Sequence, residues 1–381
     1  MAAPRAREYD AVVVGAGIVG LASAWRAAQR GLRVLVVDRG AVGAGASSVA
    51  AGMLAPVTEA DYGEEELLGL NLAGASVWAA FAAELAERSG LDTGYRESGA
   101  LVVAVDRDDL EEVRRLHALQ ESLGLDVEWL TGRECRRLEP GLSPRVGGGV
   151  LAAHDHQADP RATLAALRAA FEHEGGEVVE GIEVIGVEES GGGVAGVVTS
   201  AGAIAAGRVV IAAGAWSAGL APDAPPVRPV KGQILRLREP THPDHPLSSR
   251  IIRTPRCYVV PRPSGEVVIG ATVEERGFDP RVTAGGVHRL LEAAWEVLPD
   301  VEERELVETG AGFRPGTPDN APVVGPGSLD GLIWATGHHR NGILLAPITA
   351  TAVTQLLTGS DPLKTFAAFG PERFQLAGRR A

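Results

Sequence analysis

Tyr9-Asp-Ala-Val-Val-Val-Gly-Ala-Gly-Ile-Val-Gly20 is the stretch of sequence that decides the fold. Its first half is an apolar run typical of a buried strand, and residues 18–30 that follow the glycines read as a helix. Gly15 allows a tight turn, Gly17 lets the backbone approach a pyrophosphate, and Gly20 lets the helix pack closely on the strand. This pattern is the dinucleotide-binding fingerprint in the setting that it requires.

The residues after the helix complete the fingerprint. A second apolar strand, residues 33–37, ends at Asp38, about twenty residues after the first glycines, where a carboxylate accepts hydrogen bonds from a ribose. The start of the helix adds unpaired N–H groups and the positive end of its dipole, which favour an anion. A bare G-x-G-x-x-G is often only a glycine turn, but both strands, the helix and the acid are in register here. We therefore predict that an adenine dinucleotide binds at this turn.

Length and composition narrow the class of protein. The chain has 381 residues, which favours two domains, and its 45% hydrophobic content argues against disorder. A formal net charge of −13 argues against nucleic acid and anionic membrane surfaces as partners. Cys135 and Cys257, far apart in sequence, provide neither a metal-binding spacing nor a disulfide framework. The two isolated cysteines and the short charged N-terminus, which leads straight into the first strand, predict a protein of the reducing cytoplasm.

Two uncharged stretches bear on membrane insertion. Residues 40–58 are rich in Gly, Ser and Ala, and residues 342–360 contain Pro347, Gln355 and several threonines. Neither has the continuous apolar character of a membrane-spanning helix, so we expect no membrane partner.

The order of the patterns predicts an α/β fold with two domains. We expect a Rossmann-like nucleotide-binding domain with a mostly parallel sheet, and a second α+β domain built on an antiparallel sheet that binds substrate. The insertion after residue 95 has no fingerprint of its own, and residues 227–307 are rich in strands. The predicted nucleotide-binding domain is discontinuous (1–95, 148–226 and 308–381), and the substrate-binding domain comprises 96–147 and 227–307.

Further small and polar residues are candidates for ligand contacts. Residues 43–53 are small, include Ser47, and indicate either a second cradle for phosphate and ring or simply a tightly packed loop. The strand 208–214 ends on Gly214, as strands do at the carboxyl edge of a parallel sheet, where ligands collect. His154 and His156 bracket an aspartate, but no third ligand is near in sequence, so a polar loop is the alternative to a metal site and we predict no metal.

Two arginines lie in loops punctuated by glycine and proline. Arg314 belongs to Gly310-Ala-Gly-Phe-Arg-Pro-Gly-Thr-Pro-Asp-Asn-Ala-Pro-Val-Val-Gly325, and Arg340 to Thr336-Gly-His-His-Arg-Asn-Gly-Ile-Leu-Leu-Ala-Pro347. A planar guanidinium binds a carboxylate through two parallel hydrogen bonds. Arginines in such loops are otherwise solvated surface residues, and the sequence pattern alone leaves both interpretations open.

These motifs together carry a resemblance to a known family. The fingerprint with Asp38-Arg39, the Ala51-Gly-Met53 cradle, Gly312-Phe-Arg-Pro-Gly316 and the segment from Gly337 to Pro347 resemble the FAD-dependent glycine oxidases of the glycine oxidase/D-amino-acid oxidase family. The resemblance covers nearly the whole chain. Its last two motifs are fairly specific, whereas many flavoproteins share the fingerprint.

The resemblance implies a role for particular residues. Arg314 matches the arginine that pairs with the substrate carboxylate, Tyr258 matches a tyrosine near that carboxylate, and Arg340 matches an active-site arginine in a flavin-contacting segment. Val273 stands where some relatives have a methionine that lines the pocket, which puts side-chain preference in question. The cofactor-binding residues that the fingerprint and the resemblance imply are Gly15, Ala16, Gly17, Ile18, Val19, Gly20, Asp38, Arg39, Ser47, Ala51, Gly52, Met53, Val184 (through its backbone, to adenine), Gly214, Gly337, His338, His339, Arg340, Asn341, Gly342, Ile343 and Leu344.

The resemblance also implies a reaction. It is oxidative deamination of glycine and other small amino acids or amines: the Cα hydrogen is transferred as hydride to N5 of a non-covalent FAD, the imine is hydrolysed, and O₂ reoxidises the flavin to give H₂O₂. His338 and His339 are candidate bases, with packing beside the flavin as the alternative. In bacteria the product would feed thiazole formation for thiamine, and relatives are often tetramers. The alternatives are a broader D-amino-acid oxidase or sarcosine-type amine oxidase and, since the fingerprint alone does not separate them, an NAD-binding dehydrogenase or a non-catalytic nucleotide-binding protein.

Overall fold

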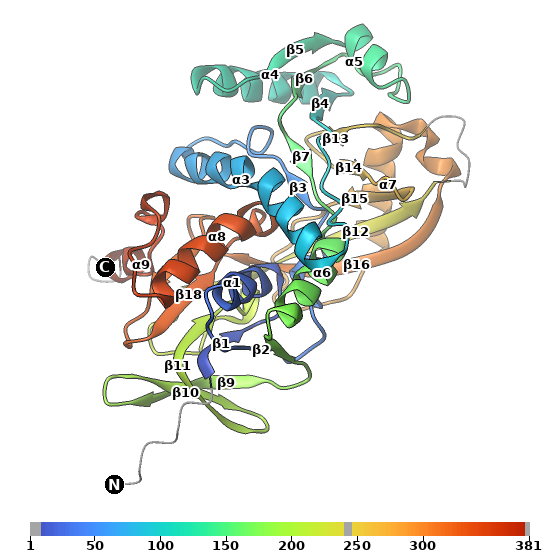
Figure 1. The fold of residues 1–381 in the computed structure, drawn as a ribbon. Coiled ribbons are helices and arrows are strands. Elements are labelled where there is room, and N and C mark those ends of the chain that lie inside the picture. Colours follow the sequence, from blue (N-terminus) through green and yellow to red (C-terminus); the bar gives the residue numbers. More distant parts are fainter. Residues whose placement is uncertain (1–8, 240–245, 378–381) are drawn as a thin grey trace.

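A computed structural model of the protein describes the fold of residues 9–239 and 246–377 (Figure 1). A mostly parallel sheet carries the fingerprint. Its strands lie in the order β17 (Val323–Pro326), β18 (Leu332–Thr336), β11 (Gly202–Ile211), β1 (Tyr9–Val14), β2 (Val34–Val37) and β8 (Glu177–Val179), with β10 (Gly193–Thr199) and β9 (Val184–Ser190) extending β11. Because β1 pairs in parallel with β2 on one side and β11 on the other, its carboxyl end is a topological switch point, where ligands bind in such sheets.

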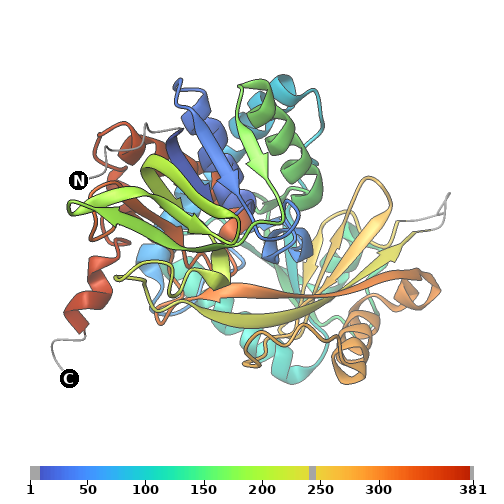
Figure 2. The ribbon, with the colours of Figure 1, turned by 90° about the horizontal axis from the view of Figure 1, so that it is seen from below.

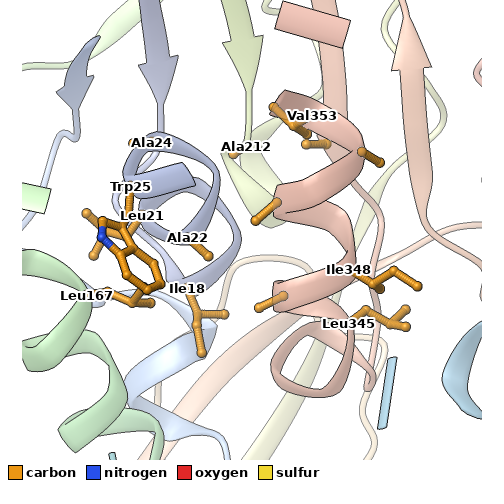
Figure 3. Packing of buried hydrophobic residues seen from close by; sticks show 14 of the residues in the cluster. Ile18, Leu21, Ala22, Ala24, Trp25, Leu167, Ala212, Leu345, Ile348 and Val353 are labelled. Atoms are coloured by element: carbon orange, nitrogen blue, oxygen red, sulfur yellow. The ribbon is translucent and has the colours of Figure 1, made fainter. Parts of the chain in front are cut away.

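Four helices build the main core next to this sheet: α1 (Ile18–Ala28), α3 (Glu65–Ser89), α6 (Pro160–His173) and α8 (Gly342–Leu357). Figure 3 shows Trp25 and Ile18 of α1 between Leu167 of α6 and Ile348 of α8. The Trp25 ring is fully buried and meets the Phe81 ring of α3 edge to face at 5.6 Å. This packing fixes α1 against the sheet, and with it the glycine turn that precedes the helix.

A second sheet lies beside the first. Its eight strands follow the order β16 (Glu305–Gly316), β12 (Arg228–Arg238), β15 (Glu266–Gly270), β14 (Tyr258–Pro261), β13 (Ile251–Arg253), β4 (Ala100–Ala104), β6 (Gly148–Ala152) and β5 (Glu128–Thr131). All neighbours pair antiparallel except β13 and β4, which are parallel. Figure 2 shows β12 and β16 as two long paired strands. This α+β unit with a largely antiparallel sheet matches the fold class expected from the sequence.

Shorter elements connect the two sheets and cover them. Strands β3 (Met53–Leu54) and β7 (His156–Gln157) form a separate antiparallel pair. The remaining helices are α2 (Ala46–Val49), α4 (Arg107–Ser122), α5 (Gly132–Leu138), α7 (Ala284–Val297) and α9 (Glu372–Ala377), with 3₁₀ turns η1 (Gly214–Trp216), η2 (Pro299–Glu303) and η3 (Lys364–Phe366).

The strand pairing differs from the predicted boundaries at two places. β6 was expected in the nucleotide-binding domain, together with most of β16, but both pair within the second sheet. Their sequences read equally well as strands of either sheet, since a strand pattern does not say which neighbour it pairs with. The division into two domains itself stays a prediction.

Within the part of the chain that the structure describes, α3 is the one helix whose length and composition match a membrane span. The most apolar window of α3 has a mean hydropathy of 1.3, and 44% of that window is buried inside the molecule. Trp78, Phe81 and Leu85 belong to its buried face and pack into the main core. The core helix of a globular protein passes the same test of length and composition.

Candidate active site

Residues of both sheets line a cleft of about 990 Å³. One wall consists of the carboxyl ends of β1 and β2, the residues after β11, and the first turns of α1 and α8. The other wall carries residues of β12, β14, β15 and β16. The cleft thus lies at the switch point that the strand order defines.

The glycine turn gives the cleft a wall of bare backbone. Gly15 has a φ of 108°, and a Cβ there would lie 2.5 Å from the Ala212 carbonyl oxygen. A Cβ on Gly20 would lie 1.9 Å from the Gly15 carbonyl oxygen. Glycine is therefore required at both positions, because no side chain fits between β1, α1 and the end of β11.

The first turn of α1 faces the cleft with its positive end. Its N-cap residue is Gly17, which has no side chain to cap the helix, and the Ile18 N–H instead donates to Ser47 Oγ at 3.1 Å. Gly17, Ile18 and Ser47 all line the cleft. Such a helix start is suited to a phosphate group, because its N–H groups and dipole favour negative charge.

Asp38 lies at the end of β2, as the fingerprint predicts. Its Oδ2 accepts a hydrogen bond from the Ala16 N–H at 2.7 Å, and its Oδ1 accepts one from the Gly40 N–H at 2.8 Å. A carboxylate oxygen can accept a second hydrogen bond, so Asp38 both braces the glycine turn and remains able to accept from ribose hydroxyls. Beside it, the Arg39 guanidinium lies 4.1 Å from the centre of the Trp216 ring, a cation–π contact.

The residues of the predicted cradle, 43–53, also line the cleft, with the exception of Ser48. Gly52 has a φ of 76°, and a Cβ there would lie 2.0 Å from the Ala158 carbonyl oxygen. The segment brings main-chain atoms to the cleft wall, and its contact with a cofactor stays a prediction.

Arg314 and Tyr258 meet on the opposite wall because two glycines make room for them. Arg314, on β16, lies over Gly232 of the neighbouring β12, where a Cβ would be 2.5 Å from Arg314 Nη1. Tyr258, on β14, lies over Gly270 of β15, where a Cβ would be 2.3 Å from the tyrosine hydroxyl oxygen. Since β12 and β15 are neighbours, the two side chains extend toward each other across the sheet.

The charge of Arg314 faces the cleft without a counter-ion. Its Nη1 donates to the Thr272 carbonyl oxygen at 3.2 Å, and among residues 9–239 and 246–377 no carboxylate lies within 4.0 Å of the guanidinium. Burial raises the pKa of Tyr258 above its ordinary value, while the nearby Arg314 charge opposes that shift. At neutral pH Tyr258 is therefore a hydroxyl donor next to a guanidinium, a pair suited to a carboxylate ligand.

The two histidines of the loop before α8 are neutral at ordinary pH. His338 is buried, its Nε2 lies 3.0 Å from Thr349 Oγ1, and burial lowers its pKa to about 3. Burial first, and then the charges of Arg314, Arg340 and Arg228, lower the pKa of His339 to about 4. Both values lie well below neutral pH, which favours packing over proton abstraction as the role of these side chains.

Arg340 lines the cleft, but its guanidinium is paired. Its Nη2 lies 3.2 Å from Glu64 Oε2 and donates to the Glu59 carbonyl oxygen at 3.1 Å. Glu59 Oε1 in turn lies 3.3 Å from Arg253 Nη1. The Arg340 charge is thus largely balanced by protein carboxylates, unlike that of Arg314, so a direct contact of Arg340 with a ligand stays a prediction.

The predicted site residues divide by their position relative to the cleft. Ala16, Gly20, Gly337, Asn341 and Leu344 lie behind its wall; of these, Ala16 and Gly20 form the glycine turn, and the Leu344 carbonyl oxygen accepts a hydrogen bond from the Trp78 indole. The predicted residues on the wall are Gly15, Gly17, Ile18, Val19, Asp38, Arg39, Ser47, Ala51, Gly52, Met53, Val184, Gly214, Tyr258, Arg314, His338, His339, Arg340, Gly342 and Ile343.

Several wall residues were not foreseen. Trp216, Arg253 and Glu59 line the cleft, and Gly232 and Gly270 make room for the two substrate-side candidates. A glycine inside a strand pattern signals close approach of another group, so Gly232 and Gly270 carried a readable signal. Glu59 and Arg253 carried none, because only the folded chain brings them together.

Comparison with known proteins identifies the family. The sequence profile of the family described as FAD dependent oxidoreductase matches residues 10–356. The chain is 35% identical to glycine oxidase of Geobacillus kaustophilus over 370 residues, which cover 96% of this chain and 97% of that protein. It is 38% identical to the bifunctional protein ThiO/ThiG of Trichormus variabilis over 96% of this chain, although it spans only 55% of the length of that relative. The crystal structure of the Geobacillus kaustophilus glycine oxidase matches with a TM-score of 0.88, at 35% identity, and covers 95% of this chain and 98% of that one.

The cleft fits the cofactor that this match names. A bare glycine turn, a helix start suited to phosphate and an acid at the end of β2 suit the adenylate and diphosphate of FAD, and the small-residue cradle leaves room for its rings. The cofactor is FAD, and the chain belongs to the family of FAD-dependent oxidoreductases.

Proposed function

We propose that this chain is an amino-acid oxidase of the glycine oxidase type, which converts glycine, water and O₂ into glyoxylate, ammonia and hydrogen peroxide. The relatives named glycine oxidase that cover nearly the whole chain support this proposal. The observation that carries it is the Arg314 guanidinium, which lies on the cleft wall beside Tyr258 without a protein counter-ion within reach in the described chain.

The residues of the wall have distinct tasks in this reaction. Arg314 binds the substrate carboxylate through two parallel hydrogen bonds, and the Tyr258 hydroxyl donates a further one to the same group. A bound FAD would supply the acceptor for a hydride from the substrate Cα and the route by which the electrons reach O₂. Anchoring the carboxylate orients the Cα–H bond, and orientation is the main contribution that hydride transfer asks of the protein. Hydrolysis of the released imine by water completes the deamination.

A broader D-amino-acid oxidase or sarcosine-type amine oxidase is the alternative within this class. The choice between these activities depends on how much room the cleft leaves for the substrate side chain. Val273 stands where some relatives have a methionine, and it lies on the cleft wall with 74% of its surface exposed. A short side chain at this position leaves space for an N-methyl group or a larger Cα substituent.

A wider setting for the reaction belongs to the same proposal. Similarity to bifunctional ThiO/ThiG proteins supports a role for the product in thiazole formation for thiamine. We propose a cytoplasmic location, in keeping with the few cysteines and the acidic charge, and a homo-oligomer, whose mass light scattering after size-exclusion chromatography would give.

The test is a substrate panel with the purified protein. The protein should be yellow and release FAD on heat denaturation, and hydrogen peroxide should form with glycine and sarcosine and less rapidly with D-alanine and D-proline. Turnover of bulky D-amino acids without turnover of glycine would reject the glycine assignment while leaving the oxidase class intact. A colourless protein that binds a nicotinamide cofactor instead would reject both.

A further inference from the structure

Three arginines bind the back of the small-residue cradle. Arg262 Nη2 donates to the Ala51 carbonyl oxygen, Arg236 Nη2 donates to the Ser48 carbonyl oxygen at 2.9 Å, and Arg161 Nε donates to the same oxygen at 3.0 Å. Arg236 and Arg262 come from the second sheet, whereas the cradle runs along the cofactor cleft. Side chains of the second sheet therefore hold the cradle by its main-chain carbonyl oxygens.

Arg262 differs from the other two in its charge balance. Arg236 has Glu266 at 2.5 Å and Arg161 has Glu308 at 2.6 Å, but in the described part of the chain no carboxylate lies within 4.0 Å of the Arg262 guanidinium. Its Nη1 donates to Gln157 Oε1 at 2.8 Å and to the Ala158 carbonyl oxygen at 3.0 Å, and the residue is only 5% exposed. Burial lowers the pKa of this guanidinium. A buried cation without a counter-ion is costly even when its donors are hydrogen-bonded, so the position of Arg262 calls for an explanation.

The hydrogen bond from Arg262 sets the direction of one peptide group. The Ala51–Gly52 peptide is planar and trans, so its C=O and N–H point to opposite sides. Because Arg262 holds the Ala51 oxygen at the back, the Gly52 N–H points away from the guanidinium. Ala51 and Gly52 line the cleft, and among the described residues the Gly52 N–H donates to no protein acceptor.

We propose that Arg262 is a positioning residue for the flavin: it fixes the Ala51–Gly52 peptide so that the Gly52 N–H is free to donate to the cofactor, and its unpaired charge favours the electron-rich reduced flavin. Tyr258, Val260 and Arg262 alternate along one face of β14 and the residue after it, so the strand that carries a substrate-side residue also carries this one. The proposal rests on FAD as the cofactor and not on which amino acid is oxidised.

The experiment compares Arg262→Met, which removes the charge and the donors, with Arg262→Lys, which keeps the charge but not the fork of donors. Arg304→Met is the matched control. The Arg304 side chain is also buried (8% exposed), but its Nε lies 3.6 Å from Glu239 Oε2, and it makes no contact with the cradle. FAD affinity of the apoprotein, the absorption spectrum of bound flavin and the flavin midpoint potential are measured without any substrate. Thermal stability of each apoprotein is recorded in parallel.

Arg262→Met should bind FAD about tenfold more weakly or worse, the scale of one charge-assisted hydrogen bond. Its midpoint potential should fall by about 30 mV or more, which is a tenfold change in the equilibrium of a two-electron couple. Arg262→Lys should retain most of the potential but show a shifted flavin spectrum, and Arg304→Met should change apoprotein stability alone. If Arg262→Met does not fold, the flavin spectrum and FAD affinity of Arg262→Lys test the proposal in its place.

The proposal is overturned if FAD affinity, spectrum and potential of the Arg262 variants equal those of the unaltered protein while only apoprotein stability falls. A wild-type protein that binds FAD but does not oxidise glycine would contradict the proposed function and leave this inference standing.

Discussion

Arg314 and Tyr258 extend toward each other only because Gly232 and Gly270 leave the surface of the sheet bare beneath them. The arginine motif was readable in the sequence as a candidate. Its place beside Tyr258 was not readable, because β12, β14, β15 and β16 come from separate parts of the chain and only their pairing brings these residues together. Spacing along the sequence could suggest Arg314 but could not distinguish it from Arg340, which the fold pairs with glutamates.

Replacing Arg314 with leucine should raise KM for glycine about a hundredfold or more, because the substrate carboxylate then enters a partly dry site without its charged partner. Steady-state hydrogen peroxide production measures this. Arg107→Leu is the control, since the Arg107 side chain is 90% exposed on α4. An unchanged KM in Arg314→Leu would contradict the assigned role.

Gly232→Ala tests the bare surface itself. The added methyl group would meet the end of a flexible side chain, Arg314 Nη1, at 2.5 Å, so the guanidinium should move while the fold is retained. We expect KM to rise about tenfold or more with little change in melting temperature. Gly310→Ala, on β16, is the matched control, because its nearest neighbour would be Ile234 Cδ1 at 3.6 Å. Equal KM values for the two variants would mean that the Arg314 position does not matter for binding.

His338 should make the protein sensitive to acid. Its folded-state pKa of about 3 is below the ordinary value of about 6.5, so the unfolded chain takes up a proton that the folded chain refuses. The stability from this residue is therefore present above about pH 6.5 and is lost as the pH falls toward 3, by roughly 2 kcal/mol at pH 5. Urea unfolding at pH 7.5 and pH 5 should show a smaller pH effect in His338→Gln than in the unaltered protein. His288→Gln, whose side chain is 74% exposed on α7, should leave the effect as it is.

At the scale of elements, the sequence predicted most where local chemistry decides the structure. The strand, glycine turn, helix and second strand of the fingerprint are present as expected, because Gly15 and Gly20 have steric requirements that any chain with this turn must meet. At β6 and β16 the observed strand pairing differs from the predicted grouping, because the choice between two sheets depends on partners far away in sequence.

A comparison of Gly52→Ala with Gly31→Ala tests whether the cradle contacts the flavin, because both variants strain a backbone with positive φ but only Gly52 belongs to the cradle. Both glycines have positive φ, 76° and 79°, so either alanine costs about 1–2 kcal/mol for the left-handed conformation. Around Gly31 nothing lies within 4 Å of an added Cβ, whereas at Gly52 it would meet the Ala158 carbonyl oxygen at 2.0 Å. Gly31→Ala should lose a few degrees of melting temperature and Gly52→Ala more, because its methyl group collides with the Ala158 backbone, but only Gly52→Ala should lose bound flavin, seen as a lower ratio of visible to ultraviolet absorbance. Equal flavin content in the two proteins would show that the cradle does not touch the cofactor.

At the scale of the whole molecule, the cleft joins two sheets with separate cores. A ligand that contacts both walls should couple their stabilities, because it binds only when both are folded. Free FAD at a hundred times its dissociation constant should add about 2.7 kcal/mol to the free energy of unfolding. Hydrogen exchange with and without FAD should show protection in β1 and also in β12, and protection confined to β1 would argue against a cofactor held by both sheets. FMN, which lacks the adenylate that the fingerprint recognises, is the control ligand.

The α8 helix has a consequence for how the enzyme is made. Gly342 and Ile343 of its first turn form the cleft together with Gly15 and Gly17, so the two ends of the site are more than three hundred residues apart in the chain. While the ribosome is still synthesising the segment before α8, the glycine turn exists without its closing wall. The nascent polypeptide therefore has no complete flavin cleft until α8 has emerged from the ribosome and packed beside the glycine turn.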